Sequence, residues 1–288
     1  MPSILEHHSI NSTKMLVVGE SGTGKSGMLA SLVTAGFKLR ILDFDNGIDV
    51  LKSYLTNPSS IYYKQIKDQG IDLNDAVRFK TITEEMKELR GRVIPSKGDV
   101  FRRAMETLQE WKEDDGTNLG KPRDWDRQTI VVLDSLTMLS KAALYAIQGL
   151  NGRLGEDKVG NESRRDIGQA QAQIERVLEL LYDEHFKPNV LVNSHIVWRN
   201  PEGTDPEDKL LGKKAYPSSL GVALAPRIPR FFNTVLHTMT VGSGQSTKRQ
   251  IMTTPQGSLD LKSSAPLALK PSYPIDTGLG EIFKALRS

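Results

Sequence analysis

The chain has 288 residues, of which 38% are hydrophobic and 25% are charged, as is typical of a soluble globular protein. This length is sufficient to bury a complete α/β core in one large domain. The formal net charge of +3 is too small to indicate a nucleic-acid partner, so such a partner must be argued from local clusters of charge. The absence of cysteine excludes disulfides, thiolate zinc sites and cysteine nucleophiles.

Hydropathy along the chain indicates the cellular location that we expect for the protein. No apolar run approaches the ~18 residues that a membrane-spanning helix needs, and residues 1–14 lack the apolar core of a signal peptide. We therefore expect a cytoplasmic protein without a membrane partner. Residues 1–13 are polar and are expected to form a lead-in to the first strand.

Residues 14–26 read KMLVVGESGTGKS and contain the strongest signal in the chain. The apolar run 15–18 predicts a buried strand, and the residues after it match the phosphate-binding pattern G-x-x-x-x-G-K-[ST] at every fixed position. Glycines let successive backbone N–H groups turn towards phosphate oxygens, and a helix beginning at about residue 24 adds the positive end of its dipole. A glycine-rich turn that matches by chance is the alternative, but the strand before it and the helical stretch 27–34 after it favour nucleotide binding. The residues expected to contact the nucleotide are Gly19, Glu20, Ser21, Gly22, Thr23, Gly24, Lys25, Ser26 and Gly27.

Two side chains of this loop carry the expected chemistry. Lys25 would reach the β- and γ-phosphates of a nucleoside triphosphate as a point charge. The hydroxyl of Ser26 would ligate Mg²⁺. The sequence therefore predicts a site for ATP and Mg²⁺.

The segment FKLRIL, residues 37–42, predicts a second strand that ends in Asp43-Phe44-Asp45. Carboxylates at the carboxyl end of a parallel strand lie at the edge where ligands bind in open α/β sheets. Alternatively, the two aspartates form a turn and cap the helix expected over 48–55. Both interpretations can hold, one for each aspartate.

The stretch 56–128 gives weaker signals, and its role stays open. Residues 56–70 are polar with helix-breaking Asn-Pro-Ser-Ser, and 77–82 alternate as a strand does. We expect a short helix and a loop over 84–98, a helix over 100–111 and a hydrophilic loop over 113–126.

The segment TIVVLDS, residues 129–135, predicts a central strand that delivers Asp134 beside the phosphate-binding loop. There Asp134 would hold Mg²⁺ together with Ser26, directly or through water. The alternative is that DSLT is only the N-cap of the helix expected over 136–150. Given the loop at 19–26, we favour the metal role.

The second half of the chain continues the alternation of helices and strands. A polar loop is expected over 151–166, a helix over 167–186, a strand over 189–194 ending at His195, and a long irregular stretch over 196–218. Three strands at 234–240, 250–254 and 259–261 are expected to run antiparallel, followed by a short helix. We expect one domain, with a core over 14–240 and an extension of antiparallel strands and a helix over 241–288.

This order of elements resembles the RecA-like branch of P-loop ATPases over about residues 12–285. More narrowly, it resembles the phage RecA-core ATPases associated with single-strand annealing. The resemblance implies a RecA-like α/β fold with a mostly parallel sheet and a C-terminal antiparallel extension. It also implies an ATPase that acts on single-stranded DNA in recombination or annealing, in the cytoplasm of a bacterial host. A ring or filament of copies and a single-strand DNA-binding protein are the partners that it suggests.

The resemblance also implies roles for three further residues. Asp45 aligns with the acidic residue that orients the attacking water, with Asp43 as the second choice. Aspartate is one methylene shorter than the usual glutamate, so we expect slow or DNA-stimulated hydrolysis. His195 takes the place of a sensor of the γ-phosphate, although it could equally be a satisfied core histidine. Lys262 is the best match to a cation supplied to the neighbouring subunit, with Arg227 and Arg230 as substitutes, although each could be a solvated surface charge.

Two loops would face single-stranded DNA in this arrangement. Basic groups follow the phosphates, and flat side chains stack on bases. The candidates are Arg153, Lys158, Arg164, Arg165, Trp198, Arg199, Lys213 and Lys214. Both loops also carry acidic residues, and solvated loops of mixed charge are common. Two other functions share the same core: an ATP-dependent switch or assembly factor with a protein partner, and a motor like a replicative helicase.

Overall fold

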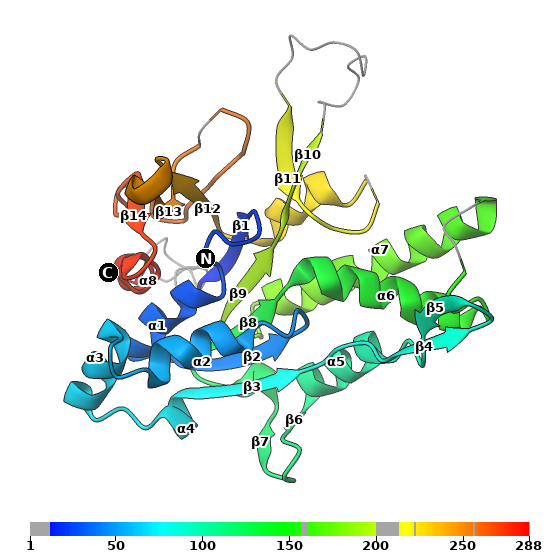
Figure 1. Ribbon diagram of the computed structural model, residues 1–288, viewed down its shortest axis with the longest axis horizontal. Helices are drawn as coiled ribbons and strands as arrows, with labels where there is room; N and C mark the ends of the chain where they lie inside the picture. The colour runs from blue at the N-terminus through cyan, green and yellow to red at the C-terminus, as the bar shows by residue number, and fades with distance from the viewer. Residues whose placement is uncertain (1–11, 157–159, 200–212, 222, 256, 288) are drawn as a thin grey trace, which may run out of the picture.

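The computed structural model describes residues 12–156, 160–199, 213–221, 223–255 and 257–287. An eight-stranded sheet lies at its centre, in the order β14-β13-β12-β1-β9-β8-β2-β3 (Figure 1). The strands of this sheet are β1 (Lys14–Gly19), β2 (Lys38–Asp43), β3 (Val77–Thr81), β8 (Thr129–Asp134), β9 (Asn189–Ser194), β12 (Thr234–Val241), β13 (Lys248–Met252) and β14 (Ser272–Pro274).

Six neighbouring strands of the sheet are parallel to one another, from β12 to β3. β1, β8 and β9 are buried along their whole length, which explains why they read as continuous apolar runs rather than as alternating ones. β9 lies between β1 and β8, with Val18 opposite Ser194 and Asp134 opposite Asn193. The carboxyl ends of these strands therefore meet at one edge of the sheet.

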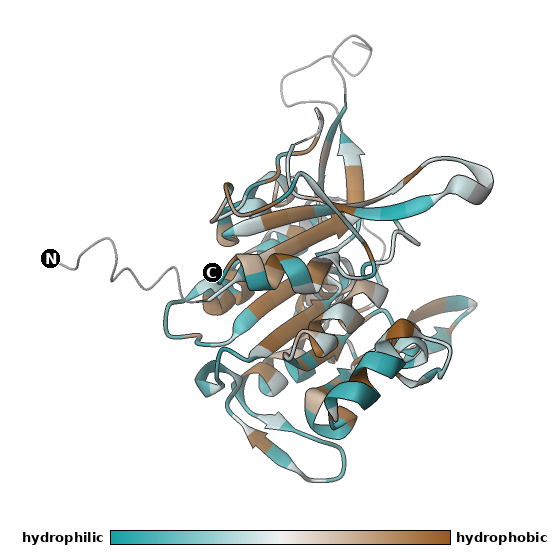
Figure 2. Ribbon diagram, turned by 90° about the vertical axis from the view of Figure 1, so that its left-hand side faces the viewer, coloured by the Kyte–Doolittle hydropathy of each residue, from teal (hydrophilic) through white to brown (hydrophobic). Residues whose placement is uncertain are grey.

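Helices cover both faces of the sheet (Figure 1). One face packs against α5 (Val100–Gln109), α6 (Leu136–Leu150) and α7 (Gly160–Tyr182). The other face packs against α1 (Ala30–Thr34), α2 (Ile48–Thr56), α3 (Ile61–Gln69) and α8 (Gly278–Ala285). Coloured by hydropathy, the strands form a hydrophobic centre between these layers (Figure 2).

The remaining elements are short. They are the helix α4 (Leu73–Ala76), 3₁₀ helices over Gly27–Leu29, Pro122–Asp124, Ala225–Phe231 and Gly244–Ser246, and the strands β4 (Met86–Leu89), β5 (Arg92–Pro95), β6 (Trp111–Lys112), β7 (Asn118–Gly120), β10 (Ile196–Arg199) and β11 (Lys214–Pro217). The six short strands form three antiparallel hairpins outside the main sheet. Of the helices in the described part of the chain, none is long and apolar enough to cross a membrane.

The predicted fold class is confirmed: an α/β fold with a mostly parallel central sheet and an antiparallel C-terminal extension. The expected antiparallel run is correct only in part, because β12 is parallel to β1 and antiparallel only to β13. The expected strand over 259–261 is wrong. Lys262 forms an isolated bridge to Val235, and β14 supplies the third strand of the extension.

Five local predictions are also wrong. The segment 84–98 contains the hairpin of β4 and β5, whose turn residues Arg90 and Gly91 have φ of 51° and 75°. The loop expected over 113–126 contains part of the hairpin of β6 and β7, and the polar stretch 56–70 contains α3. Residues 160–166 belong to α7, where Glu162, Arg164 and Arg165 are good helix formers and the rest of the segment is not. Finally, β10 and β11 pair as a hairpin within the stretch expected to be irregular.

Candidate functional site

The phosphate-binding loop lies between β1 and the 3₁₀ helix at Gly27. Gly22 and Gly24 have φ of 79° and 98°, so the loop needs glycine at both positions. A Cβ at Gly22 would meet no atom within 4 Å, which leaves open space over the turn. On its other side the loop is held by the hydroxyl of Thr23, which bonds to the Thr238 hydroxyl of β12 at 2.8 Å.

Lys25 lies inside this loop, as predicted. Its Nζ donates to the carbonyl oxygens of Gly19 and Glu20, at 2.8 and 2.7 Å, and the residue is only 7% exposed. Burial lowers the pKa of Lys25, while the charges of Asp134, Asp45 and Glu20 oppose this effect. The Lys25 side chain is therefore held by backbone carbonyl groups and shielded from bulk water.

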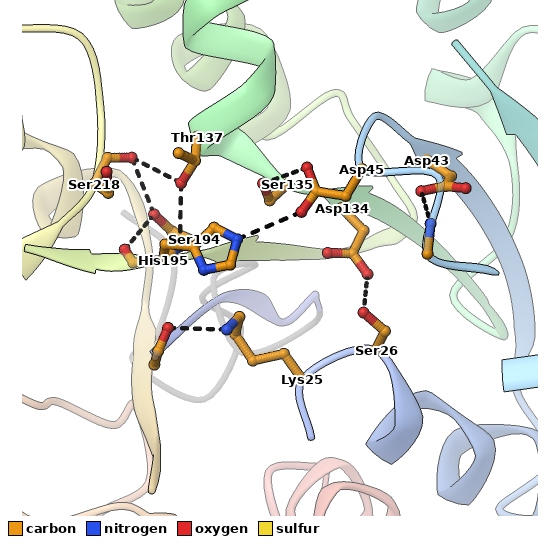
Figure 3. A network of polar contacts seen from close by, with 12 residues as sticks. Lys25, Ser26, Asp43, Asp45, Asp134, Ser135, Thr137, Ser194, His195 and Ser218 are labelled. Carbon is orange, nitrogen blue, oxygen red and sulfur yellow. Dashed lines mark hydrogen bonds and ion pairs between the residues drawn. The ribbon is translucent and has the colours of Figure 1, made fainter. Parts of the chain in front are cut away.

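Ser26 and Asp134 are 108 residues apart in sequence, and their side chains are in contact. The Ser26 hydroxyl donates to Asp134 Oδ2 at 2.7 Å (Figure 3). Burial raises the pKa of Asp134, and the hydrogen bond from Ser26 opposes this effect. A buried carboxylate beside a hydroxyl is a pair of oxygen ligands of the kind that Mg²⁺ prefers.

The two aspartates after β2 have different surroundings. Asp43 is 2% exposed and accepts hydrogen bonds from the backbone N–H of Gly47 and the hydroxyl of Thr81, both at 3.1 Å. It therefore holds the turn between β2 and α2. Asp45 faces the site instead, where its Oδ1 accepts a hydrogen bond from Ser135 at 3.0 Å.

His195, which directly follows β9, contacts Asp45. Its Nε2 lies 3.5 Å from Asp45 Oδ2, and its backbone N–H donates to the Thr137 hydroxyl at 3.1 Å. The Thr137 hydroxyl in turn donates to the carbonyl oxygen of Ser218, and the backbone N–H of Ser218 donates to the carbonyl oxygen of His195 (Figure 3). The end of β9, the first turn of α6 and the end of β11 are thus connected through one network.

Asn193 lies next to Asp134 on the neighbouring strand. It stands opposite Asp134 in the register of β8 and β9 and is fully buried. Burial raises the pKa of Asp134, and the nearby side chain of Asn193 opposes this effect, as the Ser26 hydroxyl does.

Three of the basic candidates for DNA binding lie on or next to α7. Arg153 pairs with the buried Asp166, with Nη2 2.6 Å from Oδ1, whereas Arg164 and Arg165 are exposed on the first turns of α7. Lys158 lies outside the described residues.

The other candidates lie on the hairpin of β10 and β11 or at its base. Lys213 is exposed, and Lys214 pairs with Asp260. Arg199 donates to the carbonyl oxygen of Gly221. Trp198 is 43% exposed, and its Nε1 donates to Glu20 Oε1 of the phosphate-binding loop at 3.3 Å.

Lys262 does not belong to this cluster. It bridges to Val235, near the start of β12, whereas the loop follows the opposite end of the adjacent β1. Lys262 is exposed and makes no ion pair with a described residue. Arg227 and Arg230, its predicted substitutes, both pair with Glu175 of α7.

Sequence reasoning missed several residues of the site. Thr238 supports Gly19 so closely that a Cβ there would lie 2.1 Å from its hydroxyl oxygen. Ser135 and Thr137 contact Asp45 and His195 and so orient them. Their local sequence pattern, DSLT, predicts only the N-cap of a helix. Trp198 and Glu20 are 178 positions apart, so no local sequence pattern predicts their contact.

The residues present fit a magnesium nucleotide. The open space over Gly22 leaves room for a ligand above the loop, and the inward Lys25 supplies a donor to its polar atoms. Ser26 and Asp134 would hold the metal, with the phosphates and water completing its coordination. No cluster of three or more acidic or histidine ligands occurs among the described residues, so the protein alone does not supply a full metal site there.

The fold and this site together define an α/β protein of the P-loop class. The sequence matches the AAA domain family over residues 11–264. The chain therefore belongs to the AAA domain family.

Solved structures give more distant likenesses. The flagellar accessory protein FlaH from Methanocaldococcus jannaschii is 12% identical, with a TM-score of 0.41, over 92% of this chain and 87% of that chain. The KaiC-like protein PH0186 from Pyrococcus horikoshii OT3 is 11% identical, with a TM-score of 0.37, over 91% of this chain and 84% of that chain. At this distance they carry no information on activity. No curated protein matches the sequence at a significant level.

Proposed function

We propose that the protein binds ATP with Mg²⁺ and hydrolyses it slowly at the site formed by the phosphate-binding loop and the ends of β2, β8 and β9. The observation that carries this proposal is the hydrogen bond between Ser26 and Asp134, at 2.7 Å. It joins the two segments from which a magnesium nucleotide needs ligands. Bound Mg²⁺ would neutralise charge on the phosphates.

The residues around this pair have separate parts in the proposed reaction. Lys25 exchanges its two carbonyl acceptors for phosphate oxygens when the nucleotide enters. Asp45 accepts a hydrogen bond from the attacking water, while Ser135 fixes its orientation. His195 contacts Asp45, so its position responds to whatever Asp45 holds.

The test is nucleotide binding and turnover by the full chain, measured with and without Mg²⁺. We expect fluorescent ATP to bind in the presence of Mg²⁺ and to be displaced by unlabelled ATP. We also expect phosphate release that stops when the metal is chelated. Binding that needs no metal, or an absence of binding, would contradict the proposal.

We infer that single-stranded DNA is the macromolecular partner, in recombination or strand annealing. The inference is supported by the partly exposed Trp198 on the hairpin of β10 and β11. β10 begins directly after His195, and Ser218, directly after β11, donates its backbone N–H to the carbonyl oxygen of His195. Exposed Arg164, Arg165 and Lys213 supply further cations. Against it, Lys214 and Arg153 are already paired with carboxylates.

Binding and strand-displacement assays with labelled oligonucleotides distinguish the three candidate functions. Salt-dependent binding that strengthens with a non-hydrolysable ATP analogue supports action on DNA. Nucleotide binding without DNA binding supports a switch with a protein partner. Displacement of a strand from a tailed duplex supports a helicase-like motor.

A further inference from the structure

A cavity of about 460 Å³ opens beside Asp45 and His195, which places it next to the proposed ATP site. Its volume lies within the ~300–1,000 Å³ that is typical of ligand sites. Its lining is mostly apolar and includes Ile82, Met86 and Met138. Met86 and Met138 are 46% and 38% exposed, and methionine adapts well to the shape of an apolar ligand. The cavity therefore suits a ligand with a flat, largely apolar body.

The α6 side of this cavity carries a lysine and a tyrosine one helical turn apart. Lys141 Nζ lies 5.6 Å from the centroid of the Tyr145 ring, and both residues line the cavity. Lys141 is exposed and makes no ion pair with a described residue. In proteins that bind single strands, basic groups follow the phosphates and aromatic rings stack on the bases. The pair thus offers both groups that one nucleotide of a strand needs.

A carboxylate on the β3 side of the cavity lacks one partner. Glu84 Oε1 accepts a hydrogen bond from the backbone N–H of Gly98 at 2.8 Å, but its buried Oε2 has no partner among the described residues. An ionised carboxylate oxygen only accepts hydrogen bonds, and buried polar atoms are normally paired. An N–H group that a ligand brings into the cavity would satisfy this oxygen.

The charges around the cavity define the orientation of a nucleotide in it. Glu84 and Asp45 both line the cavity and repel a phosphate, whereas Lys141 attracts one. The phosphate therefore belongs at the exposed Lys141. The base belongs towards Glu84, whose unpartnered oxygen is buried.

We propose that the cavity binds one nucleotide of single-stranded DNA, with its base on the Tyr145 ring, its phosphate at Lys141 and an amino group of the base donating to Glu84. Cytosine and adenine carry such an amino group, whereas thymine has a carbonyl oxygen in its place. The site should therefore favour cytosine over thymine. All three residues lie outside the loops 151–166 and 196–218, for which DNA contacts were predicted. The proposal rests on the proposed action on single-stranded DNA.

The test compares labelled oligo(dC) and oligo(dT) of about 16 nucleotides, which is long enough for one binding site. The full chain is first saturated with Mg²⁺ and a non-hydrolysable ATP analogue, so that the ATP site is occupied. Because burial raises the pKa of Glu84, the buffer is mildly alkaline to keep its carboxylate ionised. Glu84→Gln keeps an acceptor for Gly98 and replaces the other oxygen by an N–H donor. We expect it to lower the ratio of the affinities for oligo(dC) and oligo(dT) by about fivefold.

The other two residues should act on both oligonucleotides alike. We expect Lys141→Ala to weaken both and to reduce the slope of log affinity against log salt by about 0.7, the value for one phosphate contact on a single strand. Tyr145→Leu should weaken both by about tenfold without changing this slope, since it removes stacking and no charge.

α3 provides a matched control on the opposite face of the sheet. Lys67 Nζ lies 5.7 Å from the centroid of the Tyr63 ring, and Lys67 is exposed as Lys141 is. Lys67→Ala and Tyr63→Leu should bind both oligonucleotides as the unmodified chain does. Equal losses in the α3 and α6 variants would overturn the proposal, as would an unchanged affinity ratio in Glu84→Gln.

A photochemical measurement on the unmodified chain needs no variant to fold. Oligo(dC) that contains 5-iododeoxycytidine should, on irradiation, become linked to the α6 peptide that contains Tyr145. Linkage confined to peptides that do not line the cavity would overturn the proposal. If the unmodified chain binds neither oligonucleotide, the proposed action on DNA itself is wrong, whereas binding that is insensitive to all three α6 and Glu84 variants contradicts only this site.

Discussion

Lys25 carries the only side-chain ammonium within hydrogen-bond distance of the carbonyl groups of Gly19 and Glu20 in the described part of the chain. We expect Lys25→Ala to reduce turnover by about 10²-fold or more, since a preorganised donor to the transferring phosphoryl group is lost. Phosphate release measures this. Lys52→Ala is the matched control, because Lys52 is an exposed lysine of α2. Unchanged turnover in Lys25→Ala would exclude the loop as the site.

Asp45 and Asp43 differ by two positions and should give opposite results. We expect Asp45→Asn to retain nucleotide binding and lose hydrolysis by about 10²–10⁴-fold, the range for loss of a general base. Single-turnover hydrolysis measures this. Turnover like that of the unmodified chain would exclude Asp45 as the base.

Asp43→Asn is expected to act on stability instead. Asp43 is buried with two hydrogen-bond donors, so its loss should lower the free energy of unfolding by about 1–2 kcal/mol. Urea denaturation measures this, and the folded variant should keep most of its turnover. A stable Asp43→Asn without hydrolysis would transfer the catalytic role to Asp43.

At the scale of elements, the hairpin of β10 and β11 touches the nucleotide loop from outside the sheet, through Trp198 and Glu20. We expect bound nucleotide to draw Lys25 away from the Glu20 carbonyl and thereby to change the fluorescence of Trp198. The other two tryptophans, Trp111 and Trp125, lie in a separate cluster and supply a constant background.

Trp198→Phe and Lys25→Ala should both abolish that fluorescence change. A change that persists in Trp198→Phe would show that it arises at Trp111 or Trp125, and the hairpin would then have no demonstrated link to the nucleotide.

The elements that the sequence predicted are those with a continuous apolar or helical pattern. β1, β8 and β9 are buried on both faces, so a short continuous run of apolar residues is enough to predict each strand. The hairpin of β4 and β5 is mostly exposed, and its turn uses Arg90 at positive φ, so its composition is that of a charged helix or loop.

The site divides in the same way. The loop motif and Asp134 follow fixed local patterns, and the structure brings them together. Thr238, Thr137 and Trp198 act through contacts with residues far away in the chain, which no local pattern contains. The different environments of Asp43 and Asp45 likewise depend on Thr81 and Ser135.

At the scale of the whole molecule, one buried charge makes the stability of the fold depend on pH. Lys14 is 5% exposed, and its Nζ donates to the carbonyl oxygens of Phe186 and Pro188 at 2.6 and 3.0 Å. Burial lowers the pKa of Lys14 to about 7, opposed by the charge of Asp183. The unfolded chain keeps the ordinary value of 10.5 and therefore binds more protons between these two pH values.

The free energy of unfolding should thus rise with pH from about 7 to 10.5 through Lys14, by at most about 1.4 kcal/mol per pH unit. Lys14→Met removes this contribution, so the stability of the unmodified chain relative to this variant should increase between about pH 7 and 9. Urea denaturation at the two pH values measures this. A constant difference would show that the two carbonyl oxygens keep Lys14 charged.

The two residues that would hold the metal come from segments 108 positions apart, joined by the hydrogen bond between Ser26 and Asp134. A chain cut between these segments would leave each fragment with only one of the two oxygen ligands, so neither fragment alone should retain magnesium. Mixing the two fragments should restore retention only where their strands reassemble into one sheet.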